Sequence, residues 1–494
     1  MTSPTDAQIP RVLPVVPGLV LAGQYALTDQ EPKHRGDTLG ACVLPDQRVG
    51  LMVADVVGHG FGASLVATEL RALLWSFLHD GSTVVEALEG LDRHAARHPE
   101  LAATGIAVAV LDLQDGWMEY AAGGLAPPLV LRPGSPPIQL DATGMRPLGT
   151  AGPMRTHSTR LGYDDMVVMS TNGLRATPRP GPDKDADDLV ARAARALNDS
   201  VVRGAPPSER ADEVGRYILS HQFTADMSDD VAVLVAQRMP APEALSLDLD
   251  ADTLDLRELH RRISAWLDDL GAGLSDHVSL AHALVELATN VVNHAYRRSD
   301  LVGGWVDGQG DRPLRIDAAL DETGAVVATV SDHGEWRAPG TGAGAGRGLT
   351  MAGGLVDSLR VERSSHGTLV EIRSRLSRPV HLWQVETDPS TPTSDTFPEE
   401  MSTVIASGHL TVSGPVDEAS AELFHAALVE VTLAGTAAAT VDLTGVTLLA
   451  SPGVQSLFDV STRCTRSGAR MDIVAAECSP VRRILDLVGL VAWP

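Results

Sequence analysis

The 494-residue sequence has few cysteines, few aromatic residues and no long apolar run. Its three cysteines (Cys42, Cys464 and Cys478) are too few and too scattered for a disulfide framework or a structural zinc site, and we expect each to be a small buried residue. Aromatic residues make up 4 %, so Ala, Val and Leu must build the cores. No stretch approaches the roughly 18 apolar residues of a membrane span, and residues 1–17 lack the apolar core of a signal peptide.

Positive charge is also scarce. The chain has 39 Lys and Arg against 64 Asp and Glu, which gives a formal net charge of −25. This balance argues against a general nucleic-acid binder and against docking on an anionic membrane, because both need a positive face. We therefore expect a soluble cytoplasmic protein with no direct nucleic-acid partner and no membrane association.

Two changes in composition divide the chain. The first is the short Pro-Ala joint 239–242, and the second is a stretch rich in Pro, Ser, Thr and acidic residues that begins at Arg378. We expect a tail at 1–16, a first domain at 17–239, a second at 243–377, a linker at 378–401 and a third domain at 402–494.

The first segment alternates short apolar strands with helices, an α+β pattern, and polar residues stand where its strands end. These residues are Asp37, Asp55, Asn172 and the pair Asp229–Asp230. Carboxylates gathered from several strand ends suit Mg²⁺ or Mn²⁺, which prefer oxygen ligands. Any one of these positions, taken alone, is better explained by turn-forming Asp and Gly.

Together these positions resemble the PPM-type Ser/Thr phosphatases of the SpoIIE/RsbU class. Asp-Val-Val-Gly-His-Gly at 55–60 carries the resemblance best, supported by 121–129, 146–149 and 228–232. It implies a β-sandwich with flanking helices and two Mg²⁺ or Mn²⁺ ions; the implied ligands are Asp37, Asp55, the backbone of Val56, Asn172 and Asp229, with Asp55 also catalytic. The chain departs from this pattern twice, with Asn172 where the family has Asp and Gly123-Gly124-Leu125 where it often has Gly-His-Asn. Either change is expected to weaken metal binding or abolish turnover.

The second segment combines a polar helix face with a glycine-rich loop. Glu286, Asn290 and His294 recur at i, i+4 and i+8 on a helix expected at 280–296. A strand expected at 325–330 leads into Asp332 and Gly334, and alternating glycines run from 340 to 348. Backbone N–H groups of such a loop suit phosphate. A solvated helix face and a flexible linker are the simpler alternatives; a dinucleotide fold is disfavoured because the glycines do not follow a strand at the required spacing.

This order resembles the GHKL ATP-binding fold, an α/β sandwich, and most of all the RsbW-like anti-sigma-factor serine kinases. The resemblance implies ATP with Mg²⁺ as cofactor, Glu286 as catalytic base or hydroxyl orienter, and a homodimer through this domain. The implied ATP-site residues are Asn290 for Mg²⁺, Asp332 with Gly334 for the adenine amine, and Gly346, Arg347, Gly348 and Thr368 for the phosphates. Glu335 and Trp336 stand where the family has a second glycine, so the adenine end of the pocket is expected to differ.

The third segment alternates strands and helices over about 90 residues, as a small α/β domain does. Ser451 precedes Pro452 at an expected helix start, where a serine caps a helix without any chemistry. The segment resembles the STAS domains of anti-anti-sigma factors through 414–417, 442–446 and 451–454. The resemblance implies that Ser451 is a phosphoacceptor, although Ala450 replaces the usual preceding Asp.

A phosphatase, a kinase and their shared substrate on one chain predict a bacterial regulator of sigma-factor activity by partner switching. The expected partners are a sigma factor, anti-sigma and anti-anti-sigma proteins, and the chain's own STAS domain in cis. The main alternative is a catalytically weak scaffold that binds such partners without phosphatase turnover. A sensor histidine kinase ranks below both, because no histidine-bearing dimerisation helix precedes the ATP segment.

Overall fold

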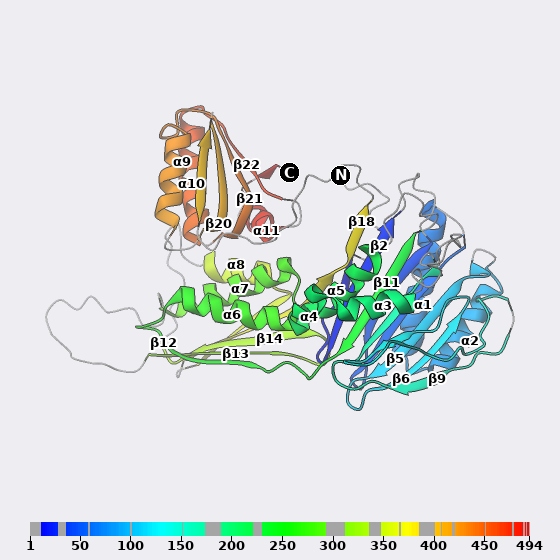
Figure 1. The fold of residues 1–494 in the computed structure, drawn as a ribbon. Coiled ribbons are helices and arrows are strands. Elements are labelled where there is room, and N and C mark those ends of the chain that lie inside the picture. The colour runs from blue at the N-terminus through cyan, green and yellow to red at the C-terminus, as the bar shows by residue number, and fades with distance from the viewer. Residues whose placement is uncertain are drawn as a thin grey trace.

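The structure is a computed structural model. It describes residues 11–27, 36–57, 60–98, 101–150, 152–172, 189–220, 230–292, 312–334, 347–364, 367–384, 401–406, 408–416, 420–449, 451–476, 479–487, 490 and 492–493. These residues form four main sheets and the helices that cover them (Figure 1). Within this part of the chain, no helix is long and apolar enough to cross a membrane.

Two stacked sheets form the first domain. One has the order β18-β2-β11-β10-β7-β8, and the other has the order β3-β4-β5-β6-β9. The strands of these sheets up to position 238 are β2 (Leu19–Leu27), β3 (Asp37–Leu44), β4 (Arg48–Asp55), β5 (Gly105–Asp112), β6 (Trp117–Gly123), β7 (Leu129–Leu131), β8 (Ile138–Gln139), β9 (His157–Arg160), β10 (Met166–Ser170) and β11 (Val231–Arg238).

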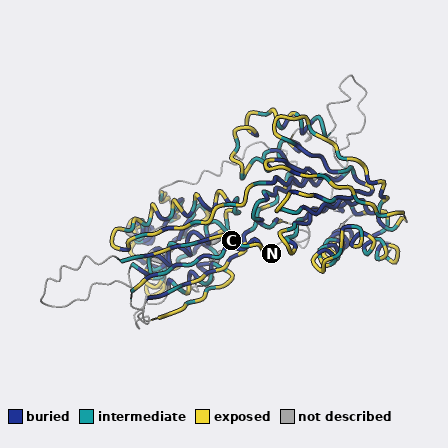
Figure 2. Tube along the Cα trace, turned by 90° about the horizontal axis from the view of Figure 1, so that it is seen from below, coloured by how far each residue is buried: buried dark blue, intermediate teal, exposed yellow. Residues whose placement is uncertain are grey.

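Three apolar layers hold this sandwich together, and buried residues follow its strands (Figure 2). The central layer lies between the two sheets. The second lies between one sheet and helices α1 (Gly60–His79) and α2 (Val84–Ala95), and the third between the other sheet and helices α3 (Leu189–Asn198), α4 (Ser200–Gly204) and α5 (Pro207–Ser220). Strand β11 is buried at every position, as a strand covered on both faces must be.

The second domain is an antiparallel sheet, with the order β12-β13-β14-β16-β15, covered by three helices. Its elements are β12 (Leu245–Asp250), α6 (Leu256–Leu270), α7 (Leu274–Asn290), β13 (Pro313–Leu320), β14 (Ala325–Asp332), α8 (Arg347–Leu355), β15 (Ser358–Ser364) and β16 (Gly367–Arg375). Helix α7 begins six residues earlier than the periodicity predicted. Residues 293–296 of the predicted helix lie outside the described residues.

The third domain has the sheet order β19-β20-β21-β22-β23. Its elements are β19 (Ser402–Ala406), β20 (His409–Val416), α9 (Ala421–Val431), β21 (Ala439–Leu449), α10 (Ser451–Arg466), β22 (Met471–Val474), α11 (Pro480–Leu487) and β23 (Ala492–Trp493). This sheet and its helices stand over α7 and α8 of the second domain (Figure 1). Helix α11 packs against α8 and α7, and one apolar core runs through both domains.

The first and second domains are joined by a strand exchange that the composition did not predict. Part of the expected linker 378–401 forms β17 (Ser377–Pro379) and β18 (His381–Gln384), and part of the expected tail 1–16 forms β1 (Val12–Pro14). Strand β17 pairs with β1, and β18 pairs in parallel with β2 as an outer strand of the first domain. These short strands have no local sequence signal, because partners distant in sequence stabilise them. Residues 385–400 lie outside the described residues.

Candidate functional site

Two of the predicted metal ligands meet on neighbouring strands. Asp37 begins β3 and Asp55 ends β4, and the two residues are direct partners in the antiparallel register. Directly paired residues place their side chains on the same face of a sheet, about 5 Å apart at Cβ. The hairpin therefore brings both carboxylates together, as the strand-end pattern predicted.

The backbone at Val56 follows these carboxylates and is held by Gly36. The Val56 N–H donates to the Gly36 carbonyl oxygen across 3.1 Å. A Cβ at position 36 would lie 2.0 Å from the Val56 carbonyl oxygen, so only glycine fits there. The carbonyl oxygen predicted as a ligand is thus fixed beside Asp55.

Thr171, which the sequence did not single out, joins the two sheets at this edge. Its hydroxyl donates to Asp37 Oδ2 across 2.5 Å and accepts a hydrogen bond from the Ala232 N–H across 2.9 Å. The next residue, Asn172, donates from Nδ2 to the Gly124 carbonyl oxygen across 2.9 Å. A Thr-Asn-Gly motif at a strand end was the signal that could have revealed this role.

The remaining predicted ligand of this site, Asp229, lies outside the described residues; its neighbour Asp230 is buried beside the start of β11. Among the described residues, no three His, Cys, Asp or Glu side chains form a group that could hold a metal. The oxygen donors of Asp37, Asp55, Val56 and Asn172 nevertheless fit the preference of Mg²⁺ or Mn²⁺.

The second domain places Glu286 and Asn290 on one face of α7, against the start of α8. A Cβ at Gly348 would lie 2.4 Å from Glu286 Oε1 and 2.8 Å from both Asn290 Oδ1 and Nδ2. Glu286 is 8 % exposed, and Asn290 Nδ2 is buried without a hydrogen-bond partner among the described residues. A buried polar atom without a partner is unfavourable, which fits a site that a polar ligand completes.

Asp332 and Thr368 lie side by side in the sheet of this domain. They are register partners on β14 and β16, and both are buried. The Gly334 N–H donates to Asp332 Oδ1 across 2.7 Å. Burial raises the pKa of the Asp332 carboxyl above its usual value, against the hydrogen bonds from the Gly334 and Thr368 backbones. A carboxylate oxygen can accept more than one hydrogen bond, so the buried Asp332 is a suitable acceptor for an adenine amine.

Three other predicted site residues, Gly346, Arg347 and Ser451, lie at or next to the ends of the described segments. Gly346 lies outside the described residues, and Arg347 begins α8, but its side chain is not described. Ser451 is the first residue of α10, at the helix start expected there, and its side chain is likewise not described. A role for Ser451 therefore stays a prediction.

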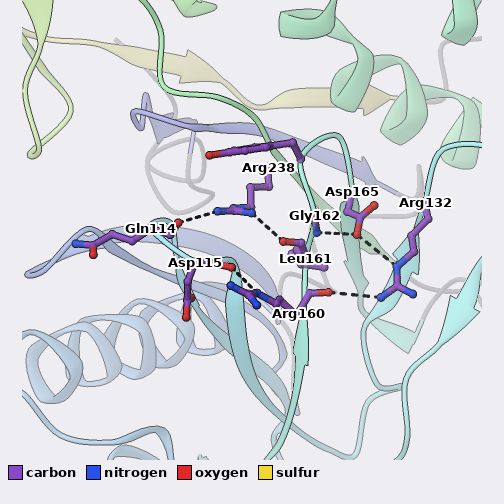
Figure 3. Close-up of a pocket in the computed structure, with 9 residues that line it drawn as sticks. Gln114, Asp115, Arg132, Arg160, Leu161, Gly162, Asp165 and Arg238 are labelled. Carbon is purple, nitrogen blue, oxygen red and sulfur yellow. Dashed lines mark hydrogen bonds and ion pairs between the residues drawn. The ribbon is translucent and has the colours of Figure 1, made fainter.

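A pocket of about 560 Å³ lies at the opposite end of the sandwich (Figure 3). Its deepest cation, Arg238, donates to the carbonyl oxygens of Leu161 and Leu113 across 3.0 Å and lies 4.4 Å from the Tyr163 ring centroid. Arg132 reaches Asp165 across 3.3 Å. These cations bind the chain's own oxygens, so we interpret the pocket as a cap where β11 leaves the domain.

Known families cover nearly the whole chain in three consecutive matches. Residues 45–239 match the family described as stage II sporulation protein E. Residues 249–374 match the histidine kinase-like ATPase domain, and residues 402–492 match a STAS domain. The crystal structure of the RsbU and RsbW domains of Rv1364c from Mycobacterium tuberculosis is 30 % identical, with a TM-score of 0.64. The match spans 78 % of the present chain and 99 % of the chain in that crystal structure.

The chain belongs to the family of RsbU–RsbW fusion proteins. The chain is also 27 % identical over 150 residues to the phosphoserine phosphatase RsbP of Bacillus subtilis (strain 168), a match that spans 28 % of this chain and 36 % of that protein. In this RsbU–RsbW protein, Asp37 and Asp55 lie in the RsbU-type domain, and Glu286 and Asp332 lie in the RsbW-type domain. A C-terminal STAS domain follows them.

Proposed function

We propose that this protein controls a sigma factor by partner switching, with a metal-dependent phosphoserine phosphatase, an ATP-dependent serine kinase and a STAS substrate on one chain. The observation that carries the proposal is the position of α8. Its first turn lies against Glu286 and Asn290, and its body packs against α11 of the STAS domain. One helix thus contacts both the proposed nucleotide site and the proposed substrate domain.

In the kinase direction, Glu286 accepts a hydrogen bond from the serine hydroxyl and orients it toward the γ-phosphoryl group of ATP. Asn290 holds Mg²⁺, Asp332 accepts from the adenine amine, and Thr368 with Gly348 contacts the phosphates. The family resemblance supports these roles, as does the contact of the first turn of α8 with Glu286 and Asn290. Ser451 at the start of α10 is the proposed acceptor, in cis or on a second STAS protein.

In the phosphatase direction, Asp37, Asp55, the Val56 carbonyl and Asn172, together with Asp229, hold Mg²⁺ or Mn²⁺. Such ions activate a water molecule and neutralise the phosphoryl group during in-line attack. The likeness to RsbP supports phosphoserine as the substrate. Removal of the phosphoryl group returns the STAS domain to the state that competes with the sigma factor for the kinase domain.

A catalytically weak scaffold is the second candidate. The neutral Asn172 favours it, because an amide brings no charge to offset a second cation. Phosphate release in Mn²⁺ from a STAS fragment phosphorylated at Ser451 separates the two candidates. Release above that of an Asp55→Ala control supports the phosphatase, and release no greater than the control supports the scaffold.

The kinase assignment is tested by incubating the full chain with γ-labelled ATP and Mg²⁺. We expect label on the intact protein and none on the Glu286→Ala or Ser451→Ala variant. Label that persists in Ser451→Ala, but not in Glu286→Ala, would keep the kinase and move the acceptor to another residue. Label that persists in Glu286→Ala would contradict the nucleotide site.

A further inference from the structure

The two residues after β10 connect the proposed metal site to both sheets of the sandwich. Asp37 belongs to the β3-β4-β5-β6-β9 sheet, whereas Thr171 follows β10 in the sheet that contains β11. We propose that Thr171 is a positioning residue that orients the Asp37 carboxylate, and that Asn172, besides its proposed role as a ligand, fastens the end of β6 through Gly124. This inference rests on the proposed phosphatase function, since it concerns the metal site of that domain.

The hydrogen bonds of Thr171 fix the direction of its proton. A hydroxyl has one proton to donate, and here its oxygen already accepts from the Ala232 N–H. The proton therefore goes to Asp37 Oδ2, 2.5 Å away. Thr171 is 2 % exposed, and its backbone N–H also donates to the Ala232 carbonyl oxygen across 3.0 Å. The hydroxyl thus holds one oxygen of the Asp37 carboxylate in place.

The contact between Asn172 and Gly124 fixes the orientation of the amide. A carbonyl oxygen can only accept, so the amide nitrogen must face Gly124, and the amide oxygen is turned away from it. Only glycine fits easily at position 124. Its φ is +75°, and an added Cβ would lie 2.9 Å from Pro147 Cγ and 3.0 Å from Gly105 Cα.

The two departures from the phosphatase pattern are therefore in direct contact. An aspartate at position 172 would place a carboxylate oxygen against the Gly124 carbonyl oxygen, and two acceptors repel each other. Asn172 and Gly124 are thus a matched pair. The replacement of the family's aspartate supplies a donor to the Gly124 carbonyl oxygen, at the expense of one negative charge at the proposed metal site.

The test measures Mn²⁺ binding to the full-length chain directly, by electron paramagnetic resonance of the unbound ion. Thr171→Val keeps the shape and removes the hydroxyl, and we expect Mn²⁺ affinity to fall about tenfold or more, as for other groups that orient metal ligands. Thr171→Ser restores the hydroxyl and should return the affinity to within about threefold of wild type. If Thr171→Val does not fold, Thr171→Ala replaces it with the same expectation.

Asn172→Asp tests whether an added negative charge at the metal site outweighs the loss of the hydrogen bond to the Gly124 carbonyl oxygen. We expect its Mn²⁺ affinity to be no higher than that of wild type, because the carboxylate meets the Gly124 carbonyl oxygen. An affinity that rises with Asn172→Asp, or that is unchanged in Thr171→Val, would overturn the inference. Asp55→Ala serves as the reference. If Asp55→Ala abolishes Mn²⁺ binding, either of these contrary results rejects only the positioning roles of Thr171 and Asn172. If Asp55→Ala binds Mn²⁺ as tightly as wild type, the proposed metal site itself is rejected.

Discussion

The indole N–H of Trp383 donates to Gln24 Oε1 across 2.7 Å, although 359 positions separate the two residues. Gln24 Nε2 donates in turn to Asp212 Oδ1 across 2.7 Å, so both ends of this fully buried amide are satisfied. His381, two residues before Trp383, reaches Asp212 across 3.3 Å. A strand from beyond the ATPase domain thus completes the phosphatase-type sheet.

We expect Trp383→Phe to destabilise the phosphatase-type domain by about 1–3 kcal/mol, because it leaves the Gln24 oxygen buried without a donor. Urea unfolding of the full-length chain measures this change. Trp117→Phe is the matched control, since Trp117 is about half exposed on β6. A fragment that ends at residue 239 should be less stable than one that spans 11–384, and equal stability would contradict the role of β18.

Gly348→Ala is expected to lower the affinity for ATP by about tenfold or more, since its methyl group would lie 2.4 Å from Glu286 Oε1 and must displace α8 or the carboxylate. Gly353→Ala on the same helix is the control, because its methyl group would have no atom closer than 3.9 Å. Calorimetric titration of both full-length variants with ATP and Mg²⁺ compares them. Equal affinities would show that α8 is not tied to the nucleotide site.

Gly36→Ala is expected to weaken Mn²⁺ binding and phosphate release together, because its methyl group would overlap the Val56 carbonyl oxygen. The backbone beside Asp55 must then shift. Gly62→Ala on α1 should change neither property, since no atom lies within 4 Å of its added methyl group. Mn²⁺ titration and a phosphate-release assay check both variants. Wild-type values in Gly36→Ala would show that the Val56 carbonyl oxygen is not a metal ligand.

His282 predicts a pH dependence of stability. Burial, together with the charge of His260, lowers the pKa of His282 from 6.5 to about 4, and neither ring nitrogen has a hydrogen-bond partner among the described residues. The folded chain therefore favours the neutral ring. The contribution of the neutral His282 ring to the free energy of unfolding is fully present above about pH 6.5 and is lost as the pH decreases toward about 4.

The expected loss between about pH 7.5 and about pH 5 is roughly 2 kcal/mol. Urea unfolding of the full-length chain at the two pH values measures it. His282→Leu should flatten this dependence, whereas His157→Gln, at an exposed position, should leave it unchanged. A His282→Leu variant with the wild-type pH dependence would contradict the prediction.

Local patterns predicted the parts of each site that lie on single elements. The strand ending at Asp55 and the polar face with Glu286 and Asn290 follow from apolar runs and helical spacing. Contacts between distant segments left no such pattern. The Thr-Asn-Gly motif at 171–173 marks a strand end but does not show that the Thr171 hydroxyl reaches Asp37, and nothing near Trp383 signals a strand that belongs to the first domain.

The same limit applies to the docking of α11. Its apolar face, with Val481, Ile484 and Leu485 buried, is visible in the sequence only as a short amphipathic stretch. Whether such a stretch covers its own domain or a neighbour depends on tertiary packing. The α10 start at Ser451, by contrast, agrees with a serine and a proline at a helix N-terminus.

The apolar core shared by the ATPase and STAS domains has a consequence for how this molecule can change state. Separating α11 from α8 would bring apolar surface into water, which is unfavourable in proportion to the area exposed. Any protein that takes the place of the STAS domain must therefore present a similar apolar surface to α8. A competing protein would therefore displace α11 by covering the same apolar surface of α8, because leaving that surface exposed to water is unfavourable.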